Sequence, residues 1–256
     1  MADYSNVRYA SLRDRVVFIS GGGSGIGAEL VTAFAAQGAR VAFIDINRTA
    51  SEQLVAELAP AEVHFHACDV RDIDRLRSVL NDVERSLGPV QVLVNNAGLD
   101  DRHRVEDLTP EYWDNCLAIN LRHHVFAAQA VLPGMKQNGG GSIINLGSIS
   151  WMRGRPGMIG YTTSKAAING LTRSLAQEIG LHGVRVNALV PGAILTERQQ
   201  EKWLTPELNQ QFLDLQALKF RLLPEHVARM ALFLGADDSA ACTGQNFIVD
   251  GGLTLN

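Results

Sequence analysis

The sequence lacks the features of a secreted, membrane-spanning or nucleic-acid-binding protein. Its three cysteines, Cys68, Cys116 and Cys242, are odd in number and far apart, which suits a reducing cytosol better than a disulfide framework. No apolar run approaches the ~20 residues of a membrane span, and residues 1–14 are too polar for a secretory signal. The formal net charge of −4 offers no footprint for nucleic acid or an anionic membrane. We therefore expect a cytoplasmic protein with no nucleic-acid or membrane partner.

Internal divisions are also lacking. No linker, charge block, low-complexity tract or short-period repeat separates one part of the 256 residues from another. A chain of this length buries a substantial core, so we expect one domain over residues 1–256. The histidine pairs His64/His66 and His123/His124 have no complete set of Cys, Asp or Glu at metal-ligand spacing. We therefore expect these histidines to be structural or to lie at the surface, and we expect no catalytic metal.

Short apolar runs alternate with longer segments of helical periodicity. The predicted strands are residues 15–20, 40–45, 62–67, 91–95, 142–147, 184–190 and 246–250, and helical patterns include residues 28–37, 72–87, 112–137, 164–181 and 224–234. Continuous Val/Ile/Leu strands between helices are typical of a parallel sheet that is covered on both faces. The sequence therefore predicts an α/β, doubly wound fold.

A glycine-rich turn, Ser20 to Gly27, follows the first predicted strand and precedes a helix. Glycines there permit a tight turn and close approach of a ligand, and the helix N-terminus offers free amides to a pyrophosphate. The spacing differs from the usual G-x-G-x-x-G, although Gly21, Gly23 and Gly25 partly overlap it. In this position the turn predicts nucleotide binding, while a purely structural turn is the alternative.

Two acidic residues follow the next two predicted strands. Asp45 lies about 20 residues after the glycine turn, where a carboxylate accepts hydrogen bonds from the hydroxyls of an adenine ribose and repels a 2′-phosphate. It favours NAD over NADP, although Arg40 and Arg48 are near in sequence. Asp69 could accept from the adenine amino group, or it or Asp72 could be a helix N-cap.

Tyr161 and Lys165 are four residues apart and share one face of a predicted helix, with Ser148 upstream. A free tyrosine titrates near ~10, so a phenol that transfers a proton near neutral pH needs help from a nearby cation. The ammonium can stabilise the phenolate, and the serine hydroxyl can bind the substrate oxygen. The arrangement indicates proton transfer at an alcohol or carbonyl oxygen, although a Y-x-x-x-K spacing alone occurs in many helices.

Together these residues resemble the short-chain dehydrogenase/reductase family over Leu12 to Leu253. The matching segments are Ser20-Gly21-x-x-x-Gly25-Ile26-Gly27, Asn95-Asn96-Ala97-Gly98, Asn120, Ser148, Tyr161-x-x-x-Lys165 and Pro191-Gly192. Ser20 stands where the family usually has threonine, and its hydroxyl can make a similar hydrogen bond. The resemblance implies a Rossmann-like, seven-stranded parallel sheet and an NAD-dependent oxidoreductase.

The resemblance also implies roles for individual residues. Tyr161 would be the general base for oxidation, Lys165 would lower its pKa and bind the nicotinamide ribose, Ser148 would bind the reacting oxygen, and Asn120 would hold a water that links Lys165 to solvent. The cofactor-binding residues would be Gly21, Ser24, Gly25, Ile26, Gly27, Asp45, Asp69, Val70, Asn96, Gly98, Tyr161, Lys165, Pro191, Ile194 and Thr196. Residues from about 193 to 222 would form a substrate lid.

The segments expected to frame the substrate are rich in charges, amides and tryptophan. Such groups favour a polyol, because polar groups reject analogues that lack matching hydroxyls and an aromatic face suits a sugar ring; solvated loops or a subunit contact are the alternatives. The predicted substrate residues are Asp100, Ser150, Trp151, Arg153, Met158, Arg198 and Trp203.

The same segments are most similar to bacterial NAD-dependent aldose 1-dehydrogenases, the D-xylose enzymes above all. Such an enzyme oxidises the anomeric hydroxyl of a cyclic pentose to a lactone. The C-terminal residues 252–256 differ from that pattern, so other polyols of the L-arabinose, L-fucose or D-galactose type stay open. A ketodeoxy sugar acid does too, because Arg153 and Arg155 suit a carboxylate. A 3-oxoacyl reductase-like enzyme is the other alternative, which Asp45 and the polar loops disfavour.

Two helical stretches, Glu111–Gln137 and Ser164–Leu181, correspond to the helices that form a four-helix interface in members of this family. The resemblance therefore implies a homotetramer.

Overall fold

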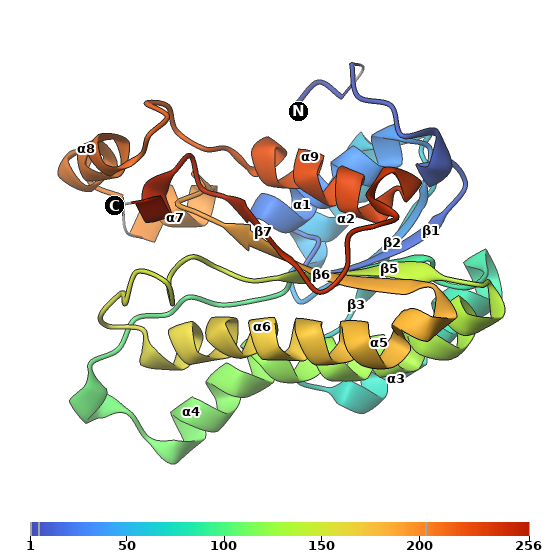
Figure 1. Cartoon of the computed structure of the whole chain (residues 1–256), viewed down its shortest axis with the longest axis horizontal. Helices are drawn as coiled ribbons and strands as arrows, with labels where there is room; N and C mark the ends of the chain where they lie inside the picture. Colours follow the sequence, from blue (N-terminus) through green and yellow to red (C-terminus); the bar gives the residue numbers. More distant parts are fainter. Residues whose placement is uncertain (1, 5, 203, 256) are drawn as a thin grey trace.

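A computed structural model describes residues 2–4, 6–202 and 204–255. Its centre is a parallel sheet of seven strands in the order β3-β2-β1-β4-β5-β6-β7 (Figure 1). The strands are β1 (Val16–Ser20), β2 (Arg40–Asp45), β3 (Val63–Ala67), β4 (Val92–Asn95), β5 (Gly141–Leu146), β6 (Val184–Pro191) and β7 (Asn246–Val249). Each predicted strand is present, with ends that agree with the prediction or differ from it by one residue.

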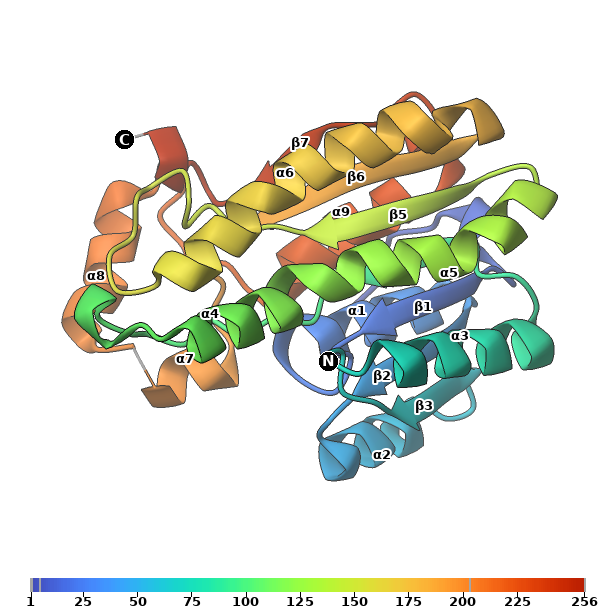
Figure 2. The ribbon, with the colours of Figure 1, turned by 90° about the horizontal axis from the view of Figure 1, so that it is seen from below.

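Helices cover both faces of the sheet. Helices α1 (Gly25–Ala36), α2 (Arg48–Glu57) and α9 (Pro224–Gly235) lie on one face, and α3 (Ile73–Leu87), α5 (His123–Gln137) and α6 (Ile159–Ile179) lie on the other (Figures 1 and 2). Three shorter helices, α4 (Pro110–Leu117), α7 (Glu197–Lys202) and α8 (Pro206–Leu215), lie toward one end of the molecule. The predicted doubly wound α/β fold is confirmed. Among the described residues, no helix is both long and apolar enough to cross a bilayer.

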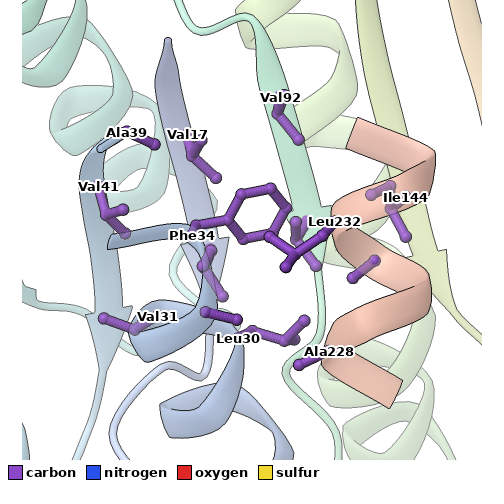
Figure 3. Packing of buried hydrophobic residues seen from close by; sticks show 14 of the residues in the cluster. Val17, Leu30, Val31, Phe34, Ala39, Val41, Val92, Ile144, Ala228 and Leu232 are labelled. Carbon is purple, nitrogen blue, oxygen red and sulfur yellow. The ribbon is translucent and has the colours of Figure 1, made fainter. Parts of the chain in front are cut away.

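The core above the sheet forms where α1 and α9 pack side by side on β1, β2 and β4 (Figure 3). Phe34 of α1 is fully buried there and faces Leu232 of α9. Gly235 lets the two helices approach closely, because a Cβ at that position would lie 3.0 Å from the Phe34 ring. Burying a side chain of this size contributes about 1.5–3 kcal/mol.

The helical pattern predicted for residues 112–137 is not one regular helix. Helices α4 and α5 are joined by a π-helical turn, Ala118–Arg122, which contains Asn120. The Asn120 amide explains the wider turn, because its Nδ2 donates to the carbonyl oxygens of Cys116 (3.0 Å) and Leu99 (3.2 Å). A side chain that bonds main-chain carbonyls in this way disturbs the regular helical ladder.

The two adjacent histidines of α5 are structural. His123 and His124 are fully buried, and burial lowers the pKa of both imidazoles, that of His123 to about 3. His124 Nδ1 lies 3.3 Å from Asn145 Oδ1 on β5, and Asn145 also accepts from Asn95 of β4 at 2.9 Å. These contacts form a neutral polar layer beneath the ends of β4 and β5. The described residues include no group of three or more His, Cys, Asp or Glu suited to a metal ion.

The strand order places a crevice at one end of the sheet. The chain moves outward from β1 to β2 and β3 and then returns to β4 on the other side of β1. Helices leave the carboxyl ends of β1 and β4 toward opposite faces, which is where open α/β sheets bind their ligands.

Candidate active site

A cavity of about 940 Å³ occupies the crevice at the carboxyl ends of the strands. It runs from the end of β2, past β1 and β4, to the lid residues that follow β6. Every predicted cofactor residue lines it, from Gly21 to Thr196. The sequence prediction therefore brought together residues that the fold places around one cavity.

The glycine-rich turn forms a backbone cradle at the start of α1. Gly21 has a φ of +68°, and a Cβ there would lie 2.8 Å from the Ala97 Cα. A Cβ on Gly27 would lie 1.8 Å from the Gly21 oxygen, so helix and turn touch through bare backbone. Helix α1 begins at Gly25, and its N-cap residue, Ser24, makes no side-chain capping bond. The first amides of α1 thus face the cavity uncapped, a geometry that fits a pyrophosphate.

Asp45 is fixed at the rim of this cradle. Its Oδ2 accepts from the Gly23 amide at 2.8 Å and its Oδ1 from the Asn47 amide at 2.8 Å. The carboxylate has lone pairs left for ribose hydroxyls. The arginines near it in sequence are engaged elsewhere, because Arg48 pairs with Glu52 and Arg40 donates to the Asp14 and Leu87 oxygens. These contacts fit an unphosphorylated ribose.

The segment after β3 lines the same end of the cavity as Asp45 and the glycine turn. Asp69 and Val70 line the cavity, and Asp69 pairs with Arg71, whose hydrogen bonds hold the pKa of the carboxyl below its usual range. Asp72, rather than Asp69, caps α3 by accepting from the Arg75 amide at 2.9 Å. Arg71 also lines the cavity and donates to Asn115 Oδ1 at 2.9 Å. Sequence analysis missed Arg71, because a single arginine after a strand carries no pattern.

The segment after β4 is tied to the glycine turn. The Ser20 hydroxyl accepts from the Asn96 and Ala97 amides at 3.0 and 3.1 Å, so serine makes the bond expected at this position. The Asn96 side chain donates to the oxygens of Ser20 and Gly21 at 3.0 and 2.8 Å. Asn96 lines the cavity, and its side-chain amide joins the segment after β4 to the glycine turn. Gly98 lies next to Lys165, since a Cβ at Gly98 would be 3.4 Å from Lys165 Nζ.

Asn120 lies behind Gly98 rather than in the cavity wall. It is buried, and its Oδ1 accepts from the Leu99 amide at 2.8 Å while its Nδ2 donates to the Leu99 and Cys116 oxygens. A Cβ on Gly98 would lie 3.1 Å from the Asn120 Oδ1, which places the amide next to Lys165. Asn120 therefore positions the loop that separates it from the cavity.

Tyr161 and Lys165 lie one turn apart on α6, and both line the cavity. Lys165 Nζ is 5.6 Å from the Tyr161 ring centroid and donates to the Leu146 oxygen at 2.7 Å. Burial lowers the pKa of Lys165 to about 8. Burial, and then the negative charge of Asp100, raise the pKa of Tyr161 well above 10, while a hydrogen bond with Ser148 opposes them. The site thus holds a neutral phenol against a cation and a hydroxyl.

Ser148 follows β5 and completes this group. Its Oγ accepts from the Ser150 amide at 3.1 Å, so the loop after β5 turns back on itself there. Tyr161, Ser148 and Lys165 line the cavity next to one another, and Ser150 and Met158, two of the predicted substrate residues, line it as well. A hydroxyl bound between Ser148 and Tyr161 would have a proton acceptor within reach.

A lid segment follows Pro191 at the end of β6. Ile194 is buried and forms a parallel β-bridge with Leu222, so the segment that contains α7 and α8 leaves and rejoins the body at one point. On α7, Arg198 pairs with Asp101 (2.8 Å) and Asp100 (3.4 Å) from the loop after β4. Ion pairs therefore join the segment after β6 to the loop after β4 at the edge of the cavity.

The predicted substrate residues have different outcomes. Asp100, Ser150, Arg153, Met158 and Arg198 line the cavity. Trp151 does not line it, and its indole N–H is buried without a hydrogen-bond acceptor among the described residues. Trp203 lies outside the described residues. The cavity residues that were not predicted as substrate residues include Arg102, Arg155 and Phe212. Arg155 was noted beside Arg153 as suited to a carboxylate, and Arg102 lies in the segment after β4 that was expected to frame the substrate.

Comparison with known proteins agrees with this geometry. Residues 21–254 match a family described as enoyl-(acyl carrier protein) reductase. The chain is 48% identical to a D-xylose 1-dehydrogenase of Caulobacter vibrioides, over 97% of this chain and 99% of that one. It is 47% identical to a Rhizobium meliloti protein named "Probable galactose dehydrogenase GalD", over 96% and 97%.

The fold has equally extensive relatives among solved structures. A short-chain type dehydrogenase/reductase from Mycobacterium ulcerans superposes with a TM-score of 0.91 at 27% identity, covering 96% of this chain and 92% of that one. Dehydrogenases of this kind use NAD or NADP, which fits the cradle at α1. The cavity, the residues that line it and these relatives lead to one conclusion: the chain is an oxidoreductase that belongs to the short-chain dehydrogenase/reductase family.

Proposed function

We propose that the protein oxidises the anomeric hydroxyl of a cyclic aldose, such as the aldopentose D-xylose, to the lactone with NAD. The observation that carries the proposal is the position of Ser148, Tyr161 and Lys165 next to one another at the cavity. The two relatives named above support a sugar substrate, since their names state D-xylose and galactose. The polar groups that line the substrate end of the cavity, such as Asp100 and Ser150, agree with a polyol.

Tyr161 is the proposed general base. Ser148 and Tyr161 bind the anomeric hydroxyl, and the hydroxyl proton passes to the Tyr161 oxygen while C1 loses its hydride. Bound NAD supplies the acceptor for that hydride. Because burial raises the pKa of Tyr161, the phenolate needs the ammonium of Lys165 beside it. Asn120 holds the loop against Lys165, and we propose that a water next to Asn120 returns the proton to solvent.

NAD is the proposed cofactor because of Asp45. The carboxylate stands at the rim of the cradle with its orientation fixed by two backbone amides, and no arginine near it in sequence is available to a 2′-phosphate. A bound 2′-phosphate would lie against a fixed negative charge. Gly21, Ser24, Gly25, Ile26 and Gly27 would hold the pyrophosphate, and Asp69 and Val70 would flank the adenine.

A panel of neutral aldoses tests the proposal. Purified protein is incubated with NAD and D-xylose, L-arabinose, D-galactose, D-glucose or L-fucose, and NADH formation is followed by absorbance. We expect turnover of at least one sugar and its loss in Tyr161→Phe, with NADH binding retained. Near-normal turnover in Tyr161→Phe would contradict the role of Tyr161, and turnover of 3-oxoacyl thioesters with NADPH alone would favour the reductase alternative.

We propose a homotetramer that is cytoplasmic. Helices α4, α5 and α6 lie side by side on one outer face (Figure 2), and Val125 of α5 is 38% exposed there. Cys68, Cys116 and Cys242 are free thiols, which suits a reducing compartment. Sedimentation as a monomer at micromolar concentration would refute the tetramer.

A further inference from the structure

Three arginines line the substrate end of the cavity close to one another. Arg153 and Arg155 come from the loop after β5, and Arg102 comes from the loop after β4. Burial lowers the pKa of the Arg155 guanidinium, and the positive charges of Arg102 and Arg153 lower it further. The Arg155 guanidinium is therefore close enough to Arg102 and to Arg153 to be repelled by both.

Two more arginines of the cavity, Arg71 and Arg198, have carboxylate partners. Arg71 pairs with Asp69, and Arg198 pairs with Asp100 and Asp101. In contrast, the side chains of Arg153 and Arg155 make no hydrogen bond or ion pair within residues 2–4, 6–202 and 204–255. Two acidic residues of α7, Glu197 and Glu201, also line the cavity but are not within ion-pair distance of either arginine.

The structure holds these arginines in place by other means. The Arg153 amide donates to the Ile149 oxygen at 3.1 Å and the Arg155 amide to the Ser150 oxygen at 3.2 Å, which folds the loop back beside Ser148. The Arg155 guanidinium lies 5.9 Å from the ring centroid of Phe212, a buried residue of the lid helix α8. An aromatic face attracts a guanidinium without neutralising it. The loop that follows Ser148 thus holds Arg153 and Arg155 at the cavity, and no carboxylate among the described residues pairs with either of them.

Clustered, partly buried cations are unfavourable unless an anion neutralises them. Guanidinium groups match a carboxylate with paired hydrogen bonds, which are stronger than neutral ones. We propose that Arg153 and Arg155 bind a carboxylate of the substrate, so that the aldose oxidised best is a sugar acid such as a uronic acid. This inference rests on the proposed sugar oxidation and assigns the substrate class of the same site.

The carboxylate is a spectator in the chemistry. Ser148 and Tyr161 bind the anomeric hydroxyl at one end of the sugar, and the arginines hold the anionic group at the other end. At C1, the hydroxyl proton goes to Tyr161 and the hydride to the nicotinamide of NAD, which leaves a C=O bond. The product is a lactone whose carboxylate is unchanged. Its hydrolysis adds one water and opens it to a dicarboxylic sugar acid.

Two series of sugars that differ at a single position test the inference. D-Xylose, D-glucose and D-glucuronate carry hydrogen, CH₂OH and carboxylate on the same ring, and L-arabinose, D-galactose and D-galacturonate form the second series. We expect kcat/KM with NAD to be highest for the uronate of at least one series. D-Glucose 6-phosphate distinguishes carboxylate from phosphate, and a tenfold preference for the phosphate ester over both uronates would overturn the carboxylate assignment.

Variants locate the effect. In Arg153→Met and Arg155→Met we expect kcat/KM for the preferred uronate to fall about 10–100-fold more than that for its neutral partner, the size expected for a lost charge-assisted hydrogen bond. Arg155→Lys keeps the positive charge but cannot make the paired hydrogen bonds of a guanidinium, so its loss of kcat/KM for the uronate should be smaller. Arg104→Met is the matched control, because Arg104 is exposed, pairs with Glu106 and does not line the cavity. In this variant the ratio of kcat/KM for the uronate to kcat/KM for its neutral partner should not change.

Three further results would overturn the inference. The first is a kcat/KM for both uronates no higher than that of their neutral partners. The second is an equal loss of kcat/KM for charged and neutral sugars in the Arg153 and Arg155 variants. The third is a change of the uronate-to-neutral ratio in Arg104→Met similar to that in those variants. If no sugar is oxidised, the proposed function fails. The inference is then tested by the dissociation constants of D-glucuronate and D-glucose for the protein–NADH complex, measured by NADH fluorescence. Equal dissociation constants for the two sugars would contradict the inference.

Discussion

Lys165 is a residue whose removal should make the protein inactive and more stable. Its side chain is 3% exposed, yet it carries an ammonium that the proposed mechanism needs beside Tyr161. Burial, the first cause, lowers its pKa from 10.5 to about 8, and the nearby Cys116 and Asp100 only partly oppose this. The folded protein therefore holds a charge that its interior disfavours.

The size of the effect follows from the shift in pKa. A change from 10.5 to about 8 corresponds to about 3 kcal/mol of unfavourable free energy when the ammonium is buried. Replacing Lys165 by methionine removes this cost and keeps a similar side-chain volume. It also removes the hydrogen bond to the Leu146 oxygen, worth about 1 kcal/mol. We expect Lys165→Met to raise the free energy of unfolding by about 2 kcal/mol and the Tm by about 4 °C at pH 7.

The dependence on pH identifies the cause. Below pH 8, Lys165 is charged in both the folded and the unfolded protein, so the folded wild type carries the full unfavourable free energy of the buried ammonium. Between pH 8 and 10.5 the unfolded chain binds more protons than the folded one, and stability of the wild type rises with pH. The Tm difference between Lys165→Met and wild type should therefore be constant below pH 8 and close as the pH rises toward 10.5.

Calorimetry without NAD, together with turnover of the best sugar, tests this prediction. We expect kcat to fall about 100-fold or more in Lys165→Met, because the phenolate loses its cation. Lys136→Met, at an exposed position near the end of α5, is the control and should raise neither the Tm nor its dependence on pH. A lower Tm for Lys165→Met at pH 7, or a difference that does not change with pH, would refute the reasoning.

Three further predictions concern the cradle and the lid. Gly27→Ala places a Cβ 1.8 Å from the Gly21 oxygen. We expect the free energy of unfolding to fall by about 1–3 kcal/mol and NADH to bind more weakly in a titration. Gly180→Ala is the control, because a Cβ there meets nothing within 4 Å, and it should change neither quantity. Asp45→Ala should lower kcat/KM with NAD and raise the NADP/NAD ratio of kcat/KM, and an unchanged ratio would contradict the assigned role. Arg198→Met leaves Asp100 unpaired, which raises the pKa of Tyr161 further; we expect the rise of kcat/KM with pH to move to higher pH, and an unmoved profile would exclude this coupling.

The sequence predicted the sheet because its central strands are buried on both faces. Runs such as residues 41–44 contain only apolar side chains, so their length and position are visible without a structure. The same holds for Tyr161 and Lys165, whose spacing places them on one helical face. Most of the predicted cofactor residues could be predicted as a group because they lie in segments that follow the strands, and parallel strands bring such segments to one edge.

Other parts of the site depend on contacts that sequence spacing does not reveal. The π-helical turn around Asn120 forms because one amide bonds the carbonyls of Leu99 and Cys116, and a helical hydrophobic pattern continues through it. Arg155 meets Phe212 only because the lid folds over the loop after β5. Trp151 was expected in the substrate cavity from its residue type and neighbours, yet its indole is directed elsewhere.

The charges around Tyr161 connect the lid, the arginines and the catalytic step. The negative charge of Asp100 raises the pKa of Tyr161, and Arg198 of the lid partly neutralises it. A substrate carboxylate would act in the same direction as Asp100, because a further anion in a cavity of low dielectric disfavours a phenolate. Arg153 and Arg155 then have two effects, since they bind the carboxylate and cancel its influence on the base. An anionic sugar without those arginines would bind poorly and would also meet a tyrosine that is harder to deprotonate. The selectivity for charge and the strength of the base therefore have to change together in any variant of this site.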